Sequence, residues 1–407
     1  MKLNVAIVFG GKSTEHEVSV ISALQAIENI DKEKYNVLAI YMDKQGDFYF
    51  NKDNLLNDSK NYKDLKALIN NSINVHFVKI KNNVYIKELN KKLFGGSVNE
   101  VVDVVFPIVH GTNVEDGNLQ GFFHTLNVPV VGPDTLAAAI SMDKYVMKEY
   151  WKALDIPVID AIRIDRTDMA DINTVLKMIE EKIKYPVIVK PINLGSSIGI
   201  KKASNSEGLK DALDLAFTFA DFVLVEKAIS NMREINCAVL GDKFSAMCSE
   251  LEEPFGNDEI LSFADKYMSG SKGGIKGGSK KPLIKNDGNK VSNNKLGGKV
   301  GGMASLKRKI PAELDNETAS NIKQCAKKIF KYLGCSGVAR IDFIIDKDNN
   351  KFYANEINSI PGSLSYYLFE PLGLSYKDMI DKLINVAIEN FKREEKLSFT
   401  FENNLLS

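Results

Sequence analysis

A stretch near the carboxyl end, residues 339–363 (ARIDFIIDKDNNKFYANEINSIPGS), constrains the fold more than any other part of the chain. Apolar runs flank a polar turn at Asp346–Asn350, a pattern typical of a β-hairpin. Because side chains alternate between the two faces of a strand, Arg340 and Asp342 share one face. Folding about the turn sets Asp342 opposite Glu356, so the sequence predicts a polar patch on an otherwise apolar ribbon.

This polar patch has the donors of a magnesium site. The carboxylates of Asp342 and Glu356 and the amide oxygen of Asn358 are hard ligands, suited to Mg²⁺ that is held together with substrate phosphates. Arg340 is placed to stabilise charge on a phosphate or an oxyanion. The alternative is a solvated hairpin face with one salt bridge. The surrounding apolar residues favour a metal site, because charges buried among them without a ligand would be costly.

Composition narrows the class of protein. The 407 residues suggest about two to three domains, and the formal net charge of zero gives no global reason to expect nucleic acid or an anionic membrane. The 4 cysteines show no CxxC or zinc-ligand spacing, which is typical of reduced core cysteines in a cytosolic protein. We find no targeting pattern and no apolar run long enough to cross a bilayer.

The first third of the chain predicts a parallel α/β sheet. Near-continuous apolar runs at Leu3–Phe9, Tyr35–Tyr41 and Val101–Val109 are typical of strands that are covered on both faces. A glycine turn and a helix follow the first run, which makes the start of a βαβ unit. We expect Thr14 and Glu17 to form a capping box at the start of this helix.

Two loops beside these strands carry candidate site residues. Glu15 lies in the first turn of the helix, where an acid otherwise complements the helix dipole. The loop 110–117 (HGTNVEDG) follows the third strand and leads into a helix at Leu119–Leu126. Its His and two acids favour a binding site, because α/β proteins bind ligands at the carboxyl ends of parallel strands. The polar stretch before the third strand predicts an edge hairpin at Val75–Lys79 and Val84–Ile86, with no assignable function.

From Asp155 the pattern changes to a smaller α/β unit, after one helix expected over Leu136–Leu154. The strand Tyr185–Lys190 runs into a Gly- and Ser-rich loop at 191–200, whose backbone N–H groups can enclose phosphates. A plain turn has the same composition. Lys190 favours the phosphate interpretation, because a half-buried ammonium needs an anion.

Two further strands and one unusual segment follow. Glu226 ends the strand Phe222–Glu226, and Glu234 opens the next; acids there suit the ribose and adenine of a nucleotide, although a surface ion pair looks the same. Residues 265–309 are rich in Gly, Lys, Ser and Asn and cannot form a core. They predict either a solvated flexible insertion or a cationic lid that orders over a phosphate-bearing ligand and excludes water. Helices are expected at Ala312–Leu333 and Tyr376–Phe391.

Taken together, these segments resemble the ATP-grasp fold and, within it, the D-alanine–D-alanine ligase family. The matching pieces occur in the family's order and span nearly the whole chain: VFGGKSTEHEVS, VFPIVHGTNVEDGNLQG, SMDKY, VIVKPINLGSSIGI, VLVEKAI, REINCAVLG, DKY, ARIDF and NEINSIPG. The resemblance implies an α/β protein with a Rossmann-like parallel-sheet domain and two α+β lobes that clamp ATP. The implied domains are 1–140 for substrate, the central lobe 141–227, the C-terminal lobe 228–396 with its lid at 268–309, and a tail at 397–407.

The resemblance also implies roles for individual residues. The implied catalytic residues are Glu15, Ser196, Tyr267, Arg340 and the backbone N–H of Gly362. The implied ATP-binding residues are Lys144, Lys190, Ser197, Glu226, Lys227, Glu234 and Lys266. The implied substrate-binding residues are Glu15, His110, Ser365 and Tyr367. The implied metal ligands are Asp342, Glu356 and Asn358, consistent with the hairpin argument.

The implied activity is an ATP-dependent ligase that joins two D-alanines, through an acyl phosphate, into D-alanyl-D-alanine for peptidoglycan synthesis in the cytoplasm. Its implied cofactors are ATP and two Mg²⁺ ions, with Mn²⁺ as an alternative ion. The expected partners are the small-molecule substrates, without nucleic acid or membrane, and members of the family are commonly homodimers.

Four features depart from the family's pattern. The lid is longer than usual, and Val114 stands where Gly is common. Ser363 replaces an apolar residue, and Tyr367 replaces a Ser that binds the carboxylate of the second substrate. A ligase of the same mechanism with another acceptor, a D-amino acid, a D-hydroxy acid or an amine, is therefore an alternative. A non-catalytic nucleic-acid-binding protein is a third hypothesis, disfavoured because the Lys/Gly tract lacks aromatic residues for base stacking.

Overall fold

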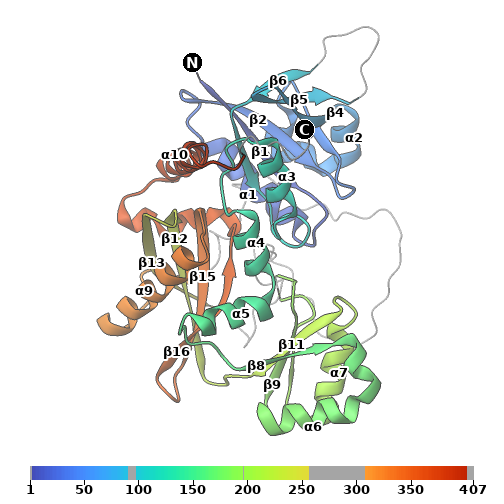
Figure 1. Cartoon of the computed structure of the whole chain (residues 1–407), viewed down its shortest axis with the longest axis vertical. Coiled ribbons are helices and arrows are strands. Elements are labelled where there is room, and N and C mark those ends of the chain that lie inside the picture. The colour runs from blue at the N-terminus through green and yellow to red at the C-terminus, as the bar shows by residue number, and fades with distance from the viewer. Residues whose placement is uncertain (1, 90–97, 196, 256–307, 401–407) are drawn as a thin grey trace, which may run out of the picture.

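A computed structural model describes residues 2–89, 98–195, 197–255 and 308–400. The strands within these ranges form three sheets, of seven, four and five strands. Figure 1 shows the N-terminal sheet at the top, the five-stranded sheet below it and the four-stranded sheet at the lower right. No helix among the described residues is long and apolar enough to span a membrane. The expected lid lies outside the described residues except for Arg308 and Lys309.

The N-terminal sheet combines parallel and antiparallel strands in the order β6-β5-β4-β3-β2-β1-β7. Its strands are β1 (Leu3–Gly10), β2 (Tyr35–Met42), β3 (Phe48–Phe50), β4 (Ile73–Ile80), β5 (Asn83–Glu88), β6 (Asn99–Val102) and β7 (Val104–Ile108). The parallel pairing expected of the first two apolar runs is confirmed, since β1 pairs parallel with both β2 and β7. The hairpin of β4 and β5 is also present, although β6 and not this hairpin occupies the edge. A short helix, α2 (Leu65–Asn70), precedes β4.

The expected single strand at Val101–Val109 is wrong. The chain bends at Asp103, so that β6 pairs with β5 whereas β7 pairs with β1. The Asp103 carboxylate accepts a hydrogen bond from the backbone N–H of Asn4 at 2.7 Å. An apolar run cannot reveal this break, because the residues on both sides of Asp103 are buried strand residues.

The first helix, α1 (His16–Asn29), follows β1 as expected, but the predicted capping box does not form. Glu15 is the N-cap residue, and no side chain caps the helix there. Glu17 instead pairs with Lys44 at 2.7 Å, and the Ser13 hydroxyl accepts the Glu15 N–H at 3.0 Å. The helix after the 110–117 loop is α3 (Asn118–Leu126).

The expected single helix at Leu136–Leu154 is also wrong. Two helices, α4 (Thr135–Met142) and α5 (Lys144–Ala153), meet at Asp143. The Asp143 carboxylate accepts the N–H groups of the first turn of α5 and so starts a new helix. As a result Lys144 is the first residue of α5, and its N–H donates to Ile192 O at 3.1 Å.

The four-stranded sheet is antiparallel, in the order β10-β9-β11-β8. Its strands are β8 (Ala161–Asp165), β9 (Val187–Pro191), β10 (Lys201–Ala203) and β11 (Phe222–Lys227). Two helices, α6 (Ile172–Lys182) and α7 (Ser206–Ala216), lie together along this sheet (Figure 1). Their apolar faces and the inner faces of the strands form one core.

The five-stranded sheet is antiparallel, in the order β14-β13-β12-β15-β16. Its strands are β12 (Met232–Gly241), β13 (Ala246–Pro254), β14 (Arg308–Lys309), β15 (Gly337–Asp346) and β16 (Lys351–Asn358). The predicted hairpin is confirmed as β15 and β16, with Asp342 paired to Glu356 and Arg340 to Asn358. Helix α9 (Asn316–Tyr332) packs its apolar side on one face of this sheet, which leaves Asp342 on the other face.

The last helix, α10 (Tyr376–Glu394), joins the two ends of the chain. It contacts α1 and β7 of the N-terminal unit and also β12 and β15. Its buried residues Met379, Ile380, Leu383 and Ile384 belong to the same core as β1 and β2. The N-terminal core is therefore completed by residues from the other end of the sequence, which lie beyond the implied boundary of the first domain. The implied domain limits stay a prediction.

Candidate active site

A cavity of about 100 Å³ opens between the four-stranded and five-stranded sheets. Apolar side chains cover part of its wall, among them Ile188 of β9 and Ile344 of β15. The six described residues expected to bind ATP all line it: Lys144, Lys190, Ser197, Glu226, Lys227 and Glu234. An apolar slot with charged groups at its rim suits a purine ring joined to a polyphosphate.

Glu226 lines this slot and is buried against two lysines. Its carboxylate forms ion pairs with Lys190 and with Lys148, the latter at 3.1 Å, and its side chain is 1% exposed. Burial alone would raise the pKa of Glu226, but the two ammonium groups lower it to about 2. Burial lowers the pKa of Lys148, and Lys190 adds to this because the two cations repel each other. The acid is thus stabilised by two partners, and each lysine has to share it.

Sequence reasoning missed Lys148. Its signal was its spacing, because Lys148 lies four residues after Lys144 and therefore on the same face of α5. Because α5 starts at the site, a second lysine at that spacing could have been predicted to lie near the site as well.

Two of the predicted ATP-binding lysines also hold the loops around the slot. The Lys144 ammonium donates to Leu194 O at 2.6 Å, which ties α5 to the Gly- and Ser-rich loop. The Lys227 ammonium donates to Tyr185 O at 2.9 Å and to Lys184 O at 3.1 Å. Both ammonium groups are therefore fixed next to the slot by backbone carbonyls.

A smaller cavity of about 40 Å³ adjoins the first and shares Lys144 and Glu356 with it. Glu15, Glu115 and Asn358 are among the other residues of its wall. Glu15 is 8% exposed, so its carboxylate is largely removed from water. Glu15, a predicted site residue from the N-terminal part of the chain, thus lines the same cavity as the hairpin residues Glu356 and Asn358.

Glycines let the neighbouring loops approach Glu15. A Cβ atom built on Gly195 would lie 2.6 Å from Glu15 Oε2, and one on Gly111 would lie 2.9 Å from the same oxygen. Gly111 also has φ +84°, a conformation that L side chains rarely adopt.

We expect Gly195→Ala to displace the Glu15 carboxylate without unfolding the protein, because the clash is with the end of a side chain. In the ligase reaction that the family resemblance implies, the catalytic efficiency for D-alanine is expected to fall by about 10- to 100-fold, since a shift of about 1 Å in a positioning group has an effect of this order. Steady-state kinetics with D-alanine varied at saturating ATP measure it.

Gly121→Ala is the matched control, because the nearest atom to its added Cβ is at 3.5 Å and Gly121 lies in α3. It should keep wild-type kinetics. An unchanged efficiency in Gly195→Ala would show that Glu15 does not need its present position.

Glu115 is one of the two acids that the sequence analysis singled out in the 110–117 loop without assigning it a role. Its carboxylate accepts the N–H groups of Gly111 at 2.9 Å and Ile360 at 2.8 Å, and the Ser359 hydroxyl at 3.1 Å. Burial raises the pKa of Glu115 to about 7, although its hydrogen bonds oppose this. Glu115 therefore ties the 110–117 loop to the turn that follows the hairpin.

His110 makes a parallel connection. Its Nδ1 lies 2.8 Å from Ile360 O and its Nε2 lies 3.0 Å from Ser22 Oγ. Ser22 Oγ in turn accepts the N–H of Ser363 at 3.0 Å. Burial lowers the pKa of His110 to about 4, so the ring is neutral, with Nδ1–H donating to Ile360. Both ring nitrogens have protein partners, which supports a positioning role; direct contact with a substrate stays a prediction.

The hairpin residues form a compact set. Arg340 Nε and Nη2 donate to the two carboxylate oxygens of Asp342 at 2.6 and 2.7 Å, and Asn358 Nδ2 lies 3.0 Å from Asp342 Oδ2. Burial opposes the charge of Arg340, but Asp342 raises its pKa well above the ordinary value. Glu356 lies directly opposite Asp342 in the register.

This donor set fits a Mg²⁺ ion. Two carboxylates and an amide supply hard oxygens from neighbouring positions on one face, and a carboxylate can accept from Arg340 and still bind a metal. No group of three or more His, Cys, Asp or Glu arranged for a metal occurs in the described part of the chain. A Mg²⁺ ion bound here would take the amide oxygen of Asn358 and oxygens of a substrate as further ligands.

The comparison with known families agrees with this arrangement. The family model described as "D-ala D-ala ligase N-terminus" matches residues 4–133, and that described as "D-ala D-ala ligase C-terminus" matches residues 150–286 and 299–385. The chain belongs to the D-alanine–D-alanine ligase family. The stretch 287–298 inside the expected lid is the part that the second model leaves unmatched.

Individual relatives cover the chain almost completely. It is 37% identical over 405 residues to the D-alanine–D-alanine ligase of Thermosipho melanesiensis, covering 99% of this chain and 98% of the relative. It is 35% identical over 406 residues to that of a Staphylococcus epidermidis strain, covering 98% and 99%.

Two solved structures confirm the ATP-grasp fold class. The D-alanine-D-alanine ligase from Coxiella burnetii has a TM-score of 0.76 and 26% identity, covering 97% of this chain and 96% of that one. The VanG D-Ala:D-Ser ligase from Enterococcus faecalis has a TM-score of 0.73 and 29% identity, covering 95% and 100%.

The ligase has an unusual backbone after Gly362. Ser363, Leu364 and Ser365 have φ of 52°, 50° and 51°, although left-handed backbone costs an L-residue roughly 1–2 kcal/mol. Strain of this kind is typical of binding and catalytic sites. Ser365 is fully buried, and its hydroxyl has no hydrogen-bond partner among the described residues. This hydroxyl is therefore a candidate to bind a polar ligand, as predicted.

The acidic row is the set Glu252, Asn236, Asp342 and Glu356, which are paired across β13, β12, β15 and β16. Arg308 pairs with Glu252 at 2.6 Å, and its guanidinium lies 4.0 Å from the centroid of the Tyr367 ring. Burial raises the pKa of Tyr367 to about 12. Sequence reasoning singled out neither Glu252 nor Arg308, because a strand of two residues after a long polar segment carries no pattern.

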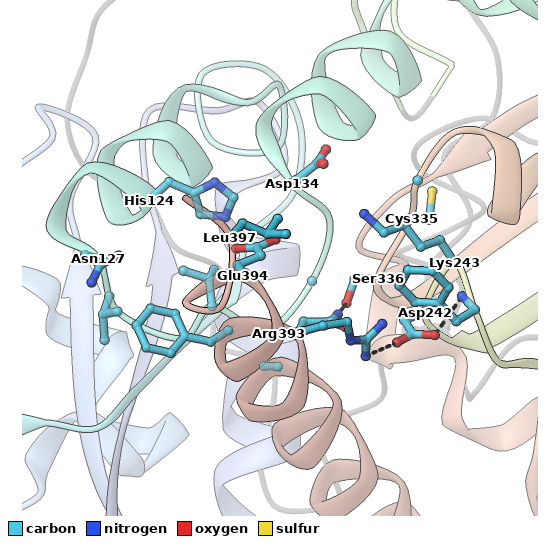
Figure 2. Close-up of a pocket in the computed structure, with 18 residues that line it drawn as sticks. His124, Asn127, Asp134, Asp242, Lys243, Cys335, Ser336, Arg393, Glu394 and Leu397 are labelled. Atoms are coloured by element: carbon cyan, nitrogen blue, oxygen red, sulfur yellow. Dashed lines mark hydrogen bonds and ion pairs between the residues drawn. The ribbon is translucent and has the colours of Figure 1, made fainter. Parts of the chain in front are cut away.

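The remaining predicted residues, Ser196, Lys266 and Tyr267, lie outside the described residues. Figure 2 shows a separate cavity of about 320 Å³ between α10, the end of α3 and the turn after β12. Arg393 crosses it to Asp242 at 2.9 Å. None of the predicted site residues lines this cavity; those that the structure describes gather instead around the two smaller cavities that share Lys144 and Glu356.

Proposed function

We propose that this ligase joins two D-alanines into D-alanyl-D-alanine, using ATP and Mg²⁺, in the cytoplasm for peptidoglycan synthesis. One observation carries the proposal: the metal-ligand hairpin lies between a lysine-lined slot and the cavity that contains Glu15. A phosphate donor and an amino acid can therefore meet beside Asp342 and Glu356. The two relatives from the sequence comparison, at 37% and 35% identity, are D-alanine–D-alanine ligases, and the D-Ala:D-Ser ligase among the solved structures is less similar in sequence, at 29%; this supports D-alanine as acceptor over the alternatives.

The slot residues would bind ATP. Its apolar wall would take adenine, Glu234 and Glu226 would lie at the ribose and adenine side, and the Lys144 and Lys190 ammoniums would bind phosphate oxygens. The expected contribution of Lys266 and Ser196 stays a prediction. Fixed ammonium groups lower the cost of bringing a carboxylate up to the γ-phosphate, because they need no reorganisation.

Glu15 would bind the ammonium of the first D-alanine and turn its carboxylate toward ATP. A carboxylate oxygen forms a bond to the γ-phosphorus while the bond from phosphorus to the ADP oxygen breaks. Arg340 would neutralise the transferred phosphoryl group. Mg²⁺ held by Asp342, Glu356 and Asn358 supplies further neutralisation of phosphate charge when bound. The number of ions, and a role for Mn²⁺, stay predictions.

The second step uses the backbone after the hairpin. The amine of the second D-alanine attacks the acyl carbon, a C–N bond forms, the C–O bond to phosphate breaks, and the amine loses a proton. The Gly362 N–H and Arg340 would stabilise the oxyanion of the intermediate. Water has to be excluded until the amine arrives, since an acyl phosphate hydrolyses.

The test is phosphate release from Mg·ATP with D-alanine alone, with the product identified by mass. We expect one phosphate for each D-alanyl-D-alanine, and no turnover after chelation of divalent ions. Phosphate release that needs a second compound would instead establish another acceptor. RNA binding without ATP turnover would overturn the enzyme interpretation. The homodimer implied by the family resemblance stays a prediction for sedimentation measurements.

A further inference from the structure

We propose that Arg308 binds the carboxylate of the second amino acid and so sets the acceptor specificity of the ligase. This inference rests on the proposed function, because it needs an amino acid as acceptor. Arg308 opens β14, where it pairs with Pro254 of β13. Because Pro254 and Glu252 are two residues apart on one strand, Arg308 lies on the same face of the sheet as the acidic row.

Arg308 is a buried cation with a prepared environment. Its side chain is 8% exposed, its Nη1 lies 2.6 Å from Glu252 Oε1, and the Tyr367 ring lies under its guanidinium. Glu252 compensates the charge, and the aromatic face orients the planar group. A guanidinium is planar and always charged, and its fork of N–H groups matches the two oxygens of a carboxylate, so Arg308 has the chemistry that recognises the carboxylate of an amino acid.

Arg340 lies within the acidic row, paired to Asp342, and further cations lie on two sides of the row. Lys144 and Lys190 border the ATP slot together with Glu356. Arg308 lies at the opposite end of the row, beside Glu252. Since the lysine side would take the phosphates, an anionic group of the acceptor is left with the Arg308 side.

The size of the acceptor also indicates that its carboxylate binds near Arg308. Its amine has to reach the acyl carbon beside Arg340, and in an amino acid a single carbon separates the amine from the carboxylate. The group that binds this carboxylate therefore has to adjoin Arg340. Glu252 and Tyr367 each interact electrostatically with both Arg340 and Arg308, which places the two arginines around the same pair of side chains.

A competition experiment tests the assignment. D-Alaninamide lacks a carboxylate, so it can act as acceptor but cannot be phosphorylated. Full-length enzyme is given Mg·ATP, D-alanine and D-alaninamide together, and the ratio of dipeptide to dipeptide amide is measured by mass spectrometry. The ratio reports acceptor choice alone and does not depend on the amount of folded enzyme.

Wild type is expected to favour D-alanine, and Arg308→Met to lower the product ratio by about 10- to 100-fold, the effect of losing a charged hydrogen bond. The KM for ATP should stay within about twofold. The matched control is Lys309→Met, which removes the same charge from the next residue of β14, where Lys309 pairs with Glu313. It should keep the wild-type ratio.

Arg308→Lys keeps the charge and loses the two-pronged donor, so its ratio should fall between those of wild type and Arg308→Met. A ratio in Arg308→Lys equal to that of Lys309→Met, or an unchanged ratio in Arg308→Met, overturns the assignment. A parallel reaction without D-alaninamide tests the proposed function separately. If wild-type enzyme forms no dipeptide from D-alanine in that reaction, the proposed function itself is overturned.

Discussion

Replacing Glu356 by Gln is expected to lower kcat by about 100- to 1,000-fold while leaving the protein folded. A metal ion at a phosphoryl-transfer site is worth several kcal/mol of charge stabilisation, and a tenfold change in rate corresponds to 1.36 kcal/mol. Glu356 is half-buried at the edge strand β16, so its loss should change stability little. Turnover as a function of Mg²⁺ concentration is the measurement, and the variant should need more Mg²⁺ than wild type.

Asp342→Asn separates the two roles of the hairpin. It should lower kcat as Glu356→Gln does, but it should also destabilise the fold by roughly 3–5 kcal/mol, because Arg340 is left buried without its counter-charge. Asp348→Asn, in the turn of the same hairpin, is the control; Asp348 accepts from exposed Asn231 at 2.7 Å. Equal Mg²⁺ dependence in Glu356→Gln and Asp348→Asn would remove Glu356 from the metal site.

Lys148→Met is expected to destabilise the ligase by about 3 kcal/mol, the lower end of the range for breaking a buried ion pair. The value is at the lower end because Glu226 keeps Lys190 as a partner. Chemical denaturation gives the free energy of unfolding. Lys152→Met on the same helix is the matched control: its pair with Glu149 is exposed and should contribute less than about 1 kcal/mol.

The pH dependence of stability gives a second readout of the same cluster. Because the folded pKa of Glu226 is lowered from 4.5 to about 2, its contribution is fully present above pH 4.5 and is lost as the pH falls toward 2. Losing Lys148 removes part of that shift, so the variant should lose less stability than wild type between pH 4.5 and 2. Parallel curves for the two proteins would show that Lys148 does not stabilise the Glu226 carboxylate.

The hairpin could be predicted from sequence because local information determined it. The alternation around Asp342 and Glu356 and the polar turn between them specify both the register and the shared face. Glu15 was identified as a candidate from its own segment. Its closeness to the hairpin could not be predicted from the local pattern, because residues far apart in the sequence come together there only in the folded chain. The family resemblance supplied that connection.

Two errors have the same physical origin. Asp103 and Asp143 each sit within a pattern that looks continuous. The Asp103 carboxylate accepts one backbone N–H, that of Asn4, at the break between β6 and β7, and the Asp143 carboxylate accepts two in the first turn of α5. Whether an Asp side chain accepts such a hydrogen bond depends on which backbone N–H groups lie next to it in the folded chain. A single sequence does not reveal that. Lys148 and Arg308 were missed because their partners, Glu226 and Glu252, come from other strands far away in sequence.

The position of α10 determines when this chain can fold during synthesis. The N-terminal sheet emerges from the ribosome first, yet its core includes Leu383 and Ile384, and Leu383 is translated 275 residues after Ile108, the end of β7. Until then its apolar surface lacks a partner, and such surfaces attract chaperones or neighbouring chains. The nascent ligase should therefore become resistant to protease only after release of its carboxyl end, and shortening the chain before Met379 should leave the first sheet, far from the deletion, prone to aggregate.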